Sequence, residues 1–530
     1  MLNTFRRLAA IALVLTPRAN GQTSLAQFTD PDRTAKLARA FPAIDSLFAA
    51  YAAREHIPGA SWGVVIDDHL AHAAPFGVRD IATHAPVDTN SVFRIASMTK
   101  SFTAVAILML RDEGKLSLDD LAEKWIPELK SLHYPTTDSP RLTIRMLLSH
   151  DTGWPEDNPW GDQQLSISDS ALGAMVARGI PFSHAPNTAY EYSNYAFMLL
   201  GRVVTRASGV PYTKFIQERI LTPLGMSSST LEPASVPRDR LAQGYRWEDQ
   251  QWKLEPQLPN GAGGSMGGML TSPRDMGVWI SMMLAAWPPR DGAELGPLKR
   301  SSLREMQQMH RSRPPAVEYD TLTKRIHLSA PAYAFGLRIM ADCRFDHIVA
   351  HAGGLPGFGS LMIWLPEYGV GMFAFGNRTY TDWSSTADSA FALLIATGGL
   401  EPRAPVPAPA LVRARDQVSR LVMSWNDALA DSLASMNLFL DHSKSHRRAQ
   451  LDSLHAKLGA CSAAKTWYVV ENALRGQWVM PCERGALGVS ITMAPTMPPS
   501  VQYLDVTAVP SSLVGASGAK RAAHGICVAR

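Results

Sequence analysis

The residues best suited to chemistry in this chain are Ser97 and Lys100, which lie three positions apart in Ser97-Met98-Thr99-Lys100. This spacing places a hydroxyl and an amine on the same side of one helical turn. The turn is anchored by apolar residues that recur at three- and four-residue steps: Phe102, Val105, Ala106, Met109 and Leu110. A lysine buried among such groups loses its charge more easily and becomes a base for the serine. The pair therefore predicts nucleophilic acyl transfer through Ser97.

A second polar motif, Tyr192-Ser193-Asn194, lies well downstream. We expect Tyr192 to carry a proton toward the leaving group. The ordinary pKa of a phenol, near roughly 10, is too high for a base at neutral pH, so the cations of Lys100 and His351 are expected to lower it. Asn194 points the same way as Tyr192 on an extended turn, and we expect it to hold the lysine or a substrate amide.

A third motif, His351-Ala352-Gly353-Gly354, follows the apolar strand-like run 348–350. The two glycines allow a substrate backbone to approach the strand edge closely. A neutral His351 that titrates near its ordinary pKa is expected to add an acid limb to the pH profile.

These three motifs, in this order, resemble those of the penicillin-recognising serine hydrolases. That family includes class C β-lactamases, serine D-alanyl-D-alanine carboxypeptidases, D-aminopeptidases and related esterases. The resemblance covers roughly residues 35 to 397 and includes two further segments, 147–153 and 263–266. It implies an α/β (α+β) fold in which a mixed sheet is joined to a helical subdomain. It also implies that the backbone N–H groups of Ser97 and Gly354 bind the oxyanion, with Gly353 beside them at the substrate edge.

Two departures from the family pattern narrow the expected activity. Class C β-lactamases carry Lys-Thr-Gly where this chain has His351-Ala352-Gly353, a form seen in members that act as peptidases or esterases. Ala352 also lacks the hydroxyl that often helps to hold a substrate carboxylate. The first departure weakens a β-lactamase assignment, and the second argues against recognition of a C-terminal carboxylate on the substrate.

Ser265 is a rival nucleophile, because Gly263-Gly264-Ser265-Met266-Gly267 matches the Gly-x-Ser-x-Gly elbow of α/β-hydrolases. That elbow requires a buried strand before the serine. The preceding segment instead contains Pro256, Pro259, Asn260 and Gly261. We therefore expect a glycine-rich rim of the active site here.

Composition excludes several other classes of function. The chain has 530 residues, a formal net charge of +4 and no dense basic stripe, so we expect no nucleic-acid partner. The pair His442 and His446 lacks the intervening glutamate of a zinc-protease helix, and neither a metal nor another cofactor is expected. No later stretch offers about 20 unbroken apolar residues, so no integral membrane segment is expected in the mature chain.

The N-terminus reads as a secretory signal over residues 1–21. Arg6 and Arg7 precede a short apolar run, and small residues allow cleavage before Gln22. We therefore expect a secreted or periplasmic protein. The four cysteines fit an oxidising compartment, and Cys461 and Cys482 lie close enough in sequence to pair within one domain.

The apolar periodicity and a Pro-rich segment together predict four regions after the signal. These are a hydrolase domain over 33–397, a Pro-rich linker over 398–411, an α+β domain over 412–509 and a tail over 510–530. In the first domain we expect a helix over 34–54, strands over 60–66, 70–76, 335–339, 347–350, 360–364 and 370–375, a mostly helical stretch over 110–330, and a helix over 383–396. In the second domain we expect helices over 418–439 and 448–458, then strands over 467–471, 477–480, 489–492 and 501–509.

The expected function is hydrolysis of an amide bond in a small peptide or peptide-like substrate, linear or of cell-wall type, through an acyl-enzyme on Ser97. A carboxylesterase and a weak β-lactamase of the same fold are the alternatives among enzymes. A penicillin-binding sensor or scaffold without turnover is the alternative from another class. The sequence leaves the oligomeric state open.

Overall fold

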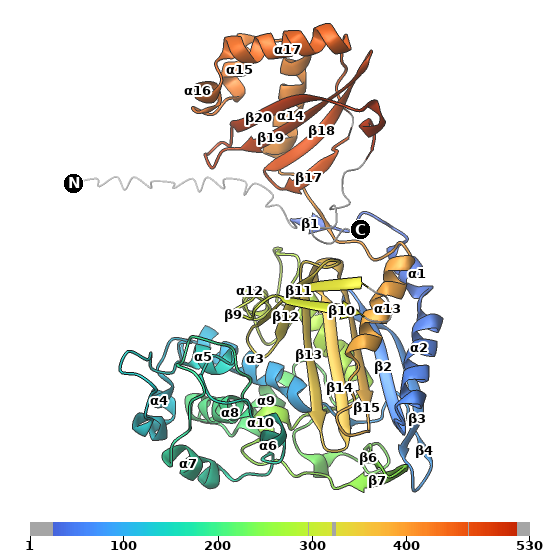
Figure 1. Cartoon of the computed structure of the whole chain (residues 1–530), viewed down its shortest axis with the longest axis vertical. Helices are drawn as coiled ribbons and strands as arrows, with labels where there is room; N and C mark the ends of the chain where they lie inside the picture. The colour runs from blue at the N-terminus through green and yellow to red at the C-terminus, as the bar shows by residue number, and fades with distance from the viewer. Residues whose placement is uncertain (1–24, 295, 321–324, 465, 517–530) are drawn as a thin grey trace, which may run out of the picture.

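The computed structural model describes residues 25–294, 296–320, 325–464 and 466–516. Its main body is built on an antiparallel sheet in the order β10-β11-β12-β13-β14-β15-β2-β3-β4, with β9 paired to β11 (Figure 1). The strands are β2 (Gly59–Ile66), β3 (His69–Asp80), β4 (Ala85–Pro86), β9 (Arg311–Ser312), β10 (Ala316–Asp320), β11 (Arg325–Tyr333), β12 (Arg338–Asp342), β13 (Ile348–Leu355), β14 (Phe358–Leu365) and β15 (Val370–Gly376). Two segments far apart in the sequence thus meet where β15 pairs with β2.

The expected α/β architecture is confirmed, with one correction to the sheet. Each neighbouring pair of strands described in it runs antiparallel, whereas a mixed sheet was expected. Tight turns join most consecutive strands, and such turns require antiparallel neighbours.

Helices cover both faces of this sheet, which explains why its central strands are apolar on both sides. Phe373 and Phe375 of β15 point into the core shared with α3 (Thr99–Asp112) and α11 (Pro273–Leu284). The alternating residues Met372 and Ala374 point into the core shared with three other helices, α1 (Arg33–Ala38), α2 (Phe41–Arg54) and α13 (Ser384–Ala396). The single helix expected over 34–54 is divided into two helices, α1 and α2, which are separated at Arg39 and Ala40.

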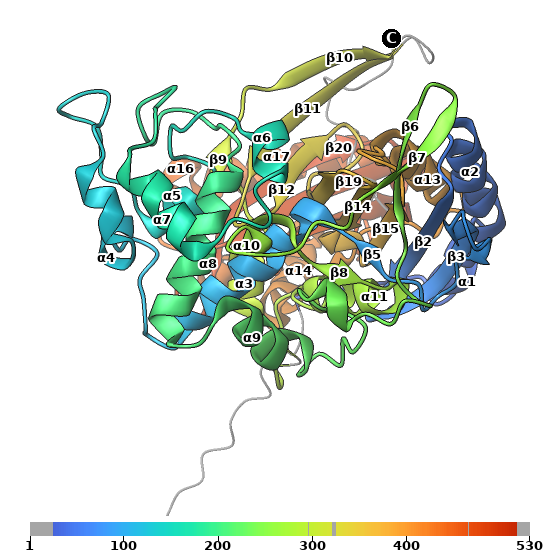
Figure 2. The same ribbon diagram turned by 90° about the horizontal axis from the view of Figure 1, so that it is seen from below.

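The long central stretch is helical only in part. Its helices are α4 (Ala122–Trp125), α5 (Ile144–Leu148), α6 (Asn158–Asp162), α7 (Asp169–Ala177), α8 (Asn194–Ser208), α9 (Tyr212–Ile216), α10 (Gly264–Gly267) and α12 (Arg300–Glu305), beside α3 and α11. A hairpin of β6 (Gly244–Glu248) and β7 (Gln251–Glu255) interrupts them, because Asp249 and Gln250 adopt the positive φ angles of a two-residue hairpin turn. Figure 2 shows that α3 lies between this helical region and the sheet.

One expected strand is displaced. Residues 334–337 form the turn between β11 and β12, so the strand expected over 335–339 begins only at Arg338. Gly336 supplies the positive φ that this turn requires. Two short pairs, β1 (Ala26–Gln27) with β16 (Ala404–Pro405) and β5 (Phe93–Arg94) with β8 (Leu270–Thr271), complete the main body.

The C-terminal region has a hydrophobic core of its own. It contains α14 (Pro409–Met423), α15 (Asp427–Leu433), α16 (Leu438–Asp441), α17 (Lys444–Leu458) and a sheet of β17 (Val469–Asn472), β18 (Arg475–Cys482), β19 (Gly485–Met493) and β20 (Val501–Val509). The expected helix over 418–439 is thus several shorter helices, because Ser424 and Ala434 leave the helical conformation. α14 starts at Pro409, inside the expected linker. Proline is well suited to the first position of a helix.

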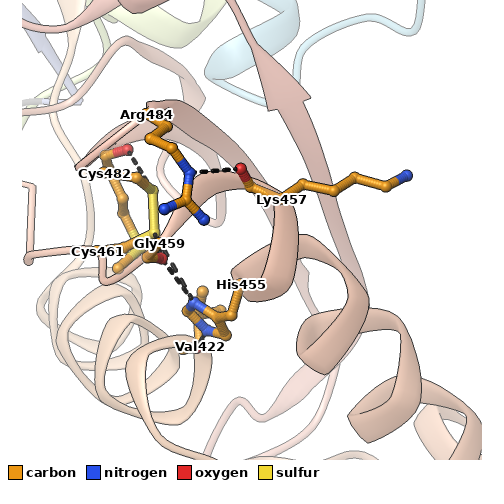
Figure 3. The surroundings of a disulfide bond; sticks show 8 residues. Val422, His455, Lys457, Gly459, Cys461, Cys482 and Arg484 are labelled. Atoms are coloured by element: carbon orange, nitrogen blue, oxygen red, sulfur yellow. Dashed lines mark hydrogen bonds between the residues drawn. A yellow bond between two sulfur atoms is a disulfide. The ribbon is translucent and has the colours of Figure 1, made fainter.

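A disulfide joins Cys461 to Cys482 and ties the segment after α17 to the end of β18 (Figure 3). Nearby, Arg484 donates a hydrogen bond to the carbonyl of Lys457, which holds the same two segments together. The Cys461–Cys482 disulfide is the pairing that their closeness in the sequence allows. The proposed signal over 1–21 lies outside the described residues, and the expected tail is described only as far as residue 516.

Candidate active site

Ser97 lies in a short 3₁₀ turn, η1 (Ala96–Met98), that leads directly into α3. Ala96 before it has a φ of 48°, an uncommon left-handed conformation for a residue with a side chain. The turn packs closely on β13, since a Cβ added at Gly353 would lie 2.2 Å from the carbonyl oxygen of Ile95. Glycine at 353 therefore lets the Ser97 turn rest on the strand that carries His351.

Lys100 is completely buried, and its three nearest partners are all oxygen atoms. Its Nζ lies 3.0 Å from Ser97 Oγ, 2.6 Å from Asn194 Oδ1 and 2.8 Å from the carbonyl oxygen of Met266. Burial lowers the pKa of Lys100 to about 7. A neutral amine here donates its two hydrogens to the amide and carbonyl oxygens, which leaves its lone pair to accept the Ser97 proton.

Asn194 is held by the N-terminus of α8. The carboxylate of Asp157 accepts hydrogen bonds from the backbone N–H of Asn194 (2.7 Å) and of Tyr195 (2.8 Å). The amide nitrogen of Asn194 donates to Asn158 Oδ1 at 3.2 Å, so its oxygen faces Lys100. Asp157 was not predicted from the sequence, because its position before a helix gives only a weak signal.

Tyr192 is buried beside this pair. Lys100 Nζ lies 4.9 Å from the centroid of its ring. Burial raises the pKa of Tyr192 well above 10, and the Ser97 side chain and the cation of Arg338 oppose this shift only in part. The expectation that nearby cations lower this pKa is therefore wrong, because the loss of hydration dominates. Tyr192 is a neutral phenol at neutral pH, able to donate a proton.

His351 is fully buried and fully hydrogen-bonded. Its Nδ1 donates a hydrogen bond to the carbonyl oxygen of Ala352 at 2.6 Å. Its Nε2 is therefore the acceptor, and it accepts a hydrogen bond from the Tyr333 hydroxyl at 2.9 Å. Burial lowers the pKa of His351 well below 6.5, with further lowering by the cations of Arg338 and Lys100. The expected titration of His351 near its ordinary pKa is thus wrong, since this imidazole stays neutral.

An aromatic cluster that the sequence analysis did not identify packs around these groups. The ring of His150 lies 4.3 Å from each of the rings of Tyr192 and Tyr333, and Tyr333 lies 5.8 Å from Tyr190. His150 Nδ1 accepts a hydrogen bond from the backbone of Ser193 at 3.1 Å. The cluster thus fixes the Tyr192 motif against His351, through residues whose spacing in the sequence carries no common pattern.

Gly354 faces a tyrosine from the loop after β15. A Cβ at Gly354 would lie 2.6 Å from the Tyr380 ring, and the Tyr380 hydroxyl donates to Asp162 at 3.0 Å. Burial raises the pKa of Asp162 to about 6. Tyr380 therefore links the sheet to the helical region directly beside Gly354.

Ser265 lies on the short helix α10 rather than on a strand-to-helix elbow. It is buried, and its hydroxyl donates to the carbonyl of Phe197 at 2.9 Å. The elbow interpretation is not supported, whereas the rim interpretation agrees with the contact between Met266 and Lys100.

The described part of the chain lacks two features that would point to other functions. Within it, no group of three or more His, Cys, Asp and Glu side chains is arranged to hold a metal ion. Among the same residues, no helix has the length and apolar character needed to cross a membrane.

Comparison with known proteins agrees with this geometry. The family model described as Beta-lactamase matches residues 44–397. Protein flp of Staphylococcus aureus (strain NCTC 8325 / PS 47) is 28% identical over 335 residues, which are 63% of this chain and 62% of that protein. The chain thus spans less than two thirds of the length of this curated relative.

Two solved structures share the fold. The octameric penicillin-binding protein homologue from Pyrococcus abyssi superposes with a TM-score of 0.57 at 24% identity, over 72% of this chain and 82% of that one. The Beta-Lactamase/D-Alanine Carboxypeptidase from Pseudomonas syringae gives 0.54 at 17% identity, over 68% and 99%. Because the family model covers well over half of the sequence, this chain belongs to the beta-lactamase family.

Proposed function

We propose that the protein is a serine hydrolase that cleaves an amide bond in small peptides or peptide-like substrates through an acyl-enzyme on Ser97. The observation that carries this proposal is the contact between Ser97 Oγ and a buried amine whose pKa is about 7. An amine of this kind activates a hydroxyl at neutral pH without help from a metal.

The proposed reaction uses each group of the site in turn. Ser97 Oγ attacks the carbonyl carbon while Lys100 accepts its proton, and the backbone N–H groups of Ser97 and Gly354 bind the oxyanion. The C–N bond then breaks as Tyr192 donates a proton to the leaving amine, and the protonated Lys100 returns a proton to the Tyr192 phenolate. Water attacks the resulting ester by the reverse sequence and releases the acid.

His351 has a positioning role in this proposal. Both of its ring nitrogens are already hydrogen-bonded within the protein, so it holds Tyr333 and the edge of β13 in place. The names of the similar solved proteins, a penicillin-binding protein homologue and a beta-lactamase/D-alanine carboxypeptidase, support an amide substrate for this chain.

We also propose secretion or periplasmic export. The charged and apolar pattern over 1–21 supports it, as does the Cys461–Cys482 disulfide, because disulfides persist in oxidising compartments. N-terminal sequencing of protein recovered from the exported fraction should begin at Gln22. An exported protein that retains residue 1 would contradict a cleaved signal.

Kinetics on a panel of substrates test the function. Peptides, including D-alanyl-D-alanine stems, are compared with p-nitrophenyl esters and nitrocefin, using the wild type, Ser97→Ala and Ser265→Ala. We expect peptide cleavage with the highest kcat/KM, its loss in Ser97→Ala, and its retention in Ser265→Ala. Faster turnover of esters or nitrocefin would assign the esterase or the β-lactamase alternative. A stable penicillin adduct without turnover of any substrate would favour a binding protein.

A further inference from the structure

A cavity of about 240 Å³ lies between the central sheet and α13. Ala350 and Ala352 of β13 line it, whereas His351 between them points to the opposite face of the strand, toward Tyr192. The floor of the cavity is therefore separated from Ser97 by β13. Tyr190 and Tyr333 also line it, so the cavity borders the aromatic cluster around Tyr192.

Small side chains on the sheet create this space. Ala350 pairs with Ile363, and Ala352 pairs with Leu361, so these four apolar residues form one continuous floor. Ala352 faces this cavity rather than Ser97, so the hydroxyl that it lacks would lie here and not beside a substrate at the candidate active site. Its absence leaves this part of the cavity apolar.

Helix α13 forms the roof. Ser384, Asp388 and Phe391 line the cavity from positions i, i+4 and i+7, which lie on one face of a helix. Asp388 is already neutralised by an ion pair with Arg344. This side of the cavity therefore presents the Phe391 ring and the carboxylate of Asp388, which is already ion-paired, to a bound ligand.

Two exposed cations, neither of which has a carboxylate partner among the described residues, line the same cavity. Arg338 stands beside Ala350 in the register of β12 with β13, and Arg313 lies over the ring of Tyr190 at 5.0 Å. Both are exposed, and across the described residues neither guanidinium forms an ion pair with a carboxylate. A guanidinium binds a carboxylate with two parallel hydrogen bonds, so this pair is suited to an organic acid.

We propose that this cavity is a binding site for a medium-chain fatty acid, with its chain between the sheet and α13 and its carboxylate on Arg313 and Arg338. The volume lies slightly below the roughly 300–1,000 Å³ of pockets for drug-sized ligands, which fits one short unbranched chain. The apolar floor favours a hydrocarbon chain, and the free cations select a negative head group. Binding is non-covalent and does not depend on Ser97.

Calorimetric titration of the full chain with octanoate, 1-octanol and octylammonium tests the proposal. Octanoate should bind with one site per chain, and octanol and octylammonium should bind at least roughly tenfold more weakly, because charged hydrogen bonds contribute most of the selectivity. The Arg313→Gln/Arg338→Gln double variant should lose that preference. Arg413→Gln, an exposed arginine outside the cavity, is the matched control and should bind as the wild type does.

Variants that fill the cavity distinguish binding of octanoate at this site from non-specific adsorption. Ile363→Trp fills the floor, and Ser384→Trp covers the space from an exposed position on α13. Each should abolish octanoate binding, whereas Ser389→Trp, exposed on the same helix but away from the cavity, should not. Circular dichroism verifies that the variants are folded. No binding to the wild type, no preference over octanol, or full binding to folded Ser384→Trp would each overturn the proposal. The Ser97→Ala variant should bind octanoate normally, so failure of the hydrolase proposal would leave this result unchanged.

Discussion

At the scale of single residues, the site depends on what burial does to charge. Lys100 loses much of its affinity for a proton because no water surrounds it, and the same loss of hydration keeps Tyr192 protonated. Burial favours the uncharged form of both groups, so the site contains a neutral amine, in contact with Ser97, and a neutral phenol.

The pH profile of kcat/KM should therefore show one acid limb near the lysine pKa. The active base is the neutral amine, so the rate should fall as Lys100 becomes protonated below about pH 7. The negative charge of Asp162 raises the pKa of Lys100, and the two groups titrate together. Asp162→Asn should therefore move the limb to lower pH. A limb that stays in place in a folded Asp162→Asn enzyme would contradict this assignment.

Removal of the phenol should slow acylation without moving that limb. Tyr192→Phe loses the proton donor, and we expect a decrease of roughly 10²- to 10⁴-fold in the acylation rate, the usual range for general acid catalysis. Stopped-flow acylation measured across the pH range gives both quantities. A wild-type rate in Tyr192→Phe would remove this residue from the mechanism.

At the scale of elements, the N-terminus of α8 positions the site. Asp157 accepts two backbone hydrogen bonds there, one of them from Asn194, and so holds Asn194 in place. The side-chain amide oxygen of Asn194 in turn contacts Lys100. A carboxylate at this end also interacts favourably with the helix dipole. The first N–H groups of α8, whose N-cap residue is Ser193, are thus linked to the active site through Asn194.

Asp157→Ala should reduce both stability and rate. Loss of the two backbone hydrogen bonds to this carboxylate should cost about 1–2 kcal/mol of the free energy of unfolding, and the displaced Asn194 should lower kcat/KM roughly tenfold or more. Ser168→Ala is the matched control, because Ser168 caps α7 away from the site. It should cost similar stability and leave the rate unchanged. Equal rates in Asp157→Ala and Ser168→Ala would show that Asp157 has no positioning role.

Sequence reasoning succeeded where contacts are local or belong to a recognised motif. The Ser97–Lys100 contact follows from three-residue spacing, and the central strands follow from their apolar runs. The partners Tyr333 and Tyr380 were not predicted, because folding brings them to the site from distant segments with no diagnostic spacing. The predicted direction of the Tyr192 pKa shift was wrong for a related reason. The burial of a side chain depends on the whole fold, whereas a neighbouring charge can be identified from a motif.

At the scale of the whole molecule, the main body and the C-terminal region have separate hydrophobic cores. All the residues of the candidate site belong to the main body. The chain connecting the two regions contributes one short strand, β16, which pairs with β1. We therefore expect the catalytic chemistry to be independent of the C-terminal region.

Breaking the disulfide tests this independence. The Cys461→Ala/Cys482→Ala variant opens a loop with a sequence separation of 21 residues and should destabilise the C-terminal region by about 3 kcal/mol. Differential scanning calorimetry should show one lowered transition, with kcat/KM unchanged. A large loss of kcat/KM would show that the C-terminal region contributes to the site. A protein truncated after residue 400 should likewise remain folded and be acylated.

The most direct test of the central claim is to trap the acyl-enzyme and locate it. The full chain is incubated with a fluorescent penicillin and with candidate peptides, quenched in acid, and analysed by intact-mass and peptide-mapping mass spectrometry. One acyl group should be attached to Ser97 and absent from Ser97→Ala. An acyl group on Ser265, or labelling that persists in Ser97→Ala, would contradict the assignment of the nucleophile.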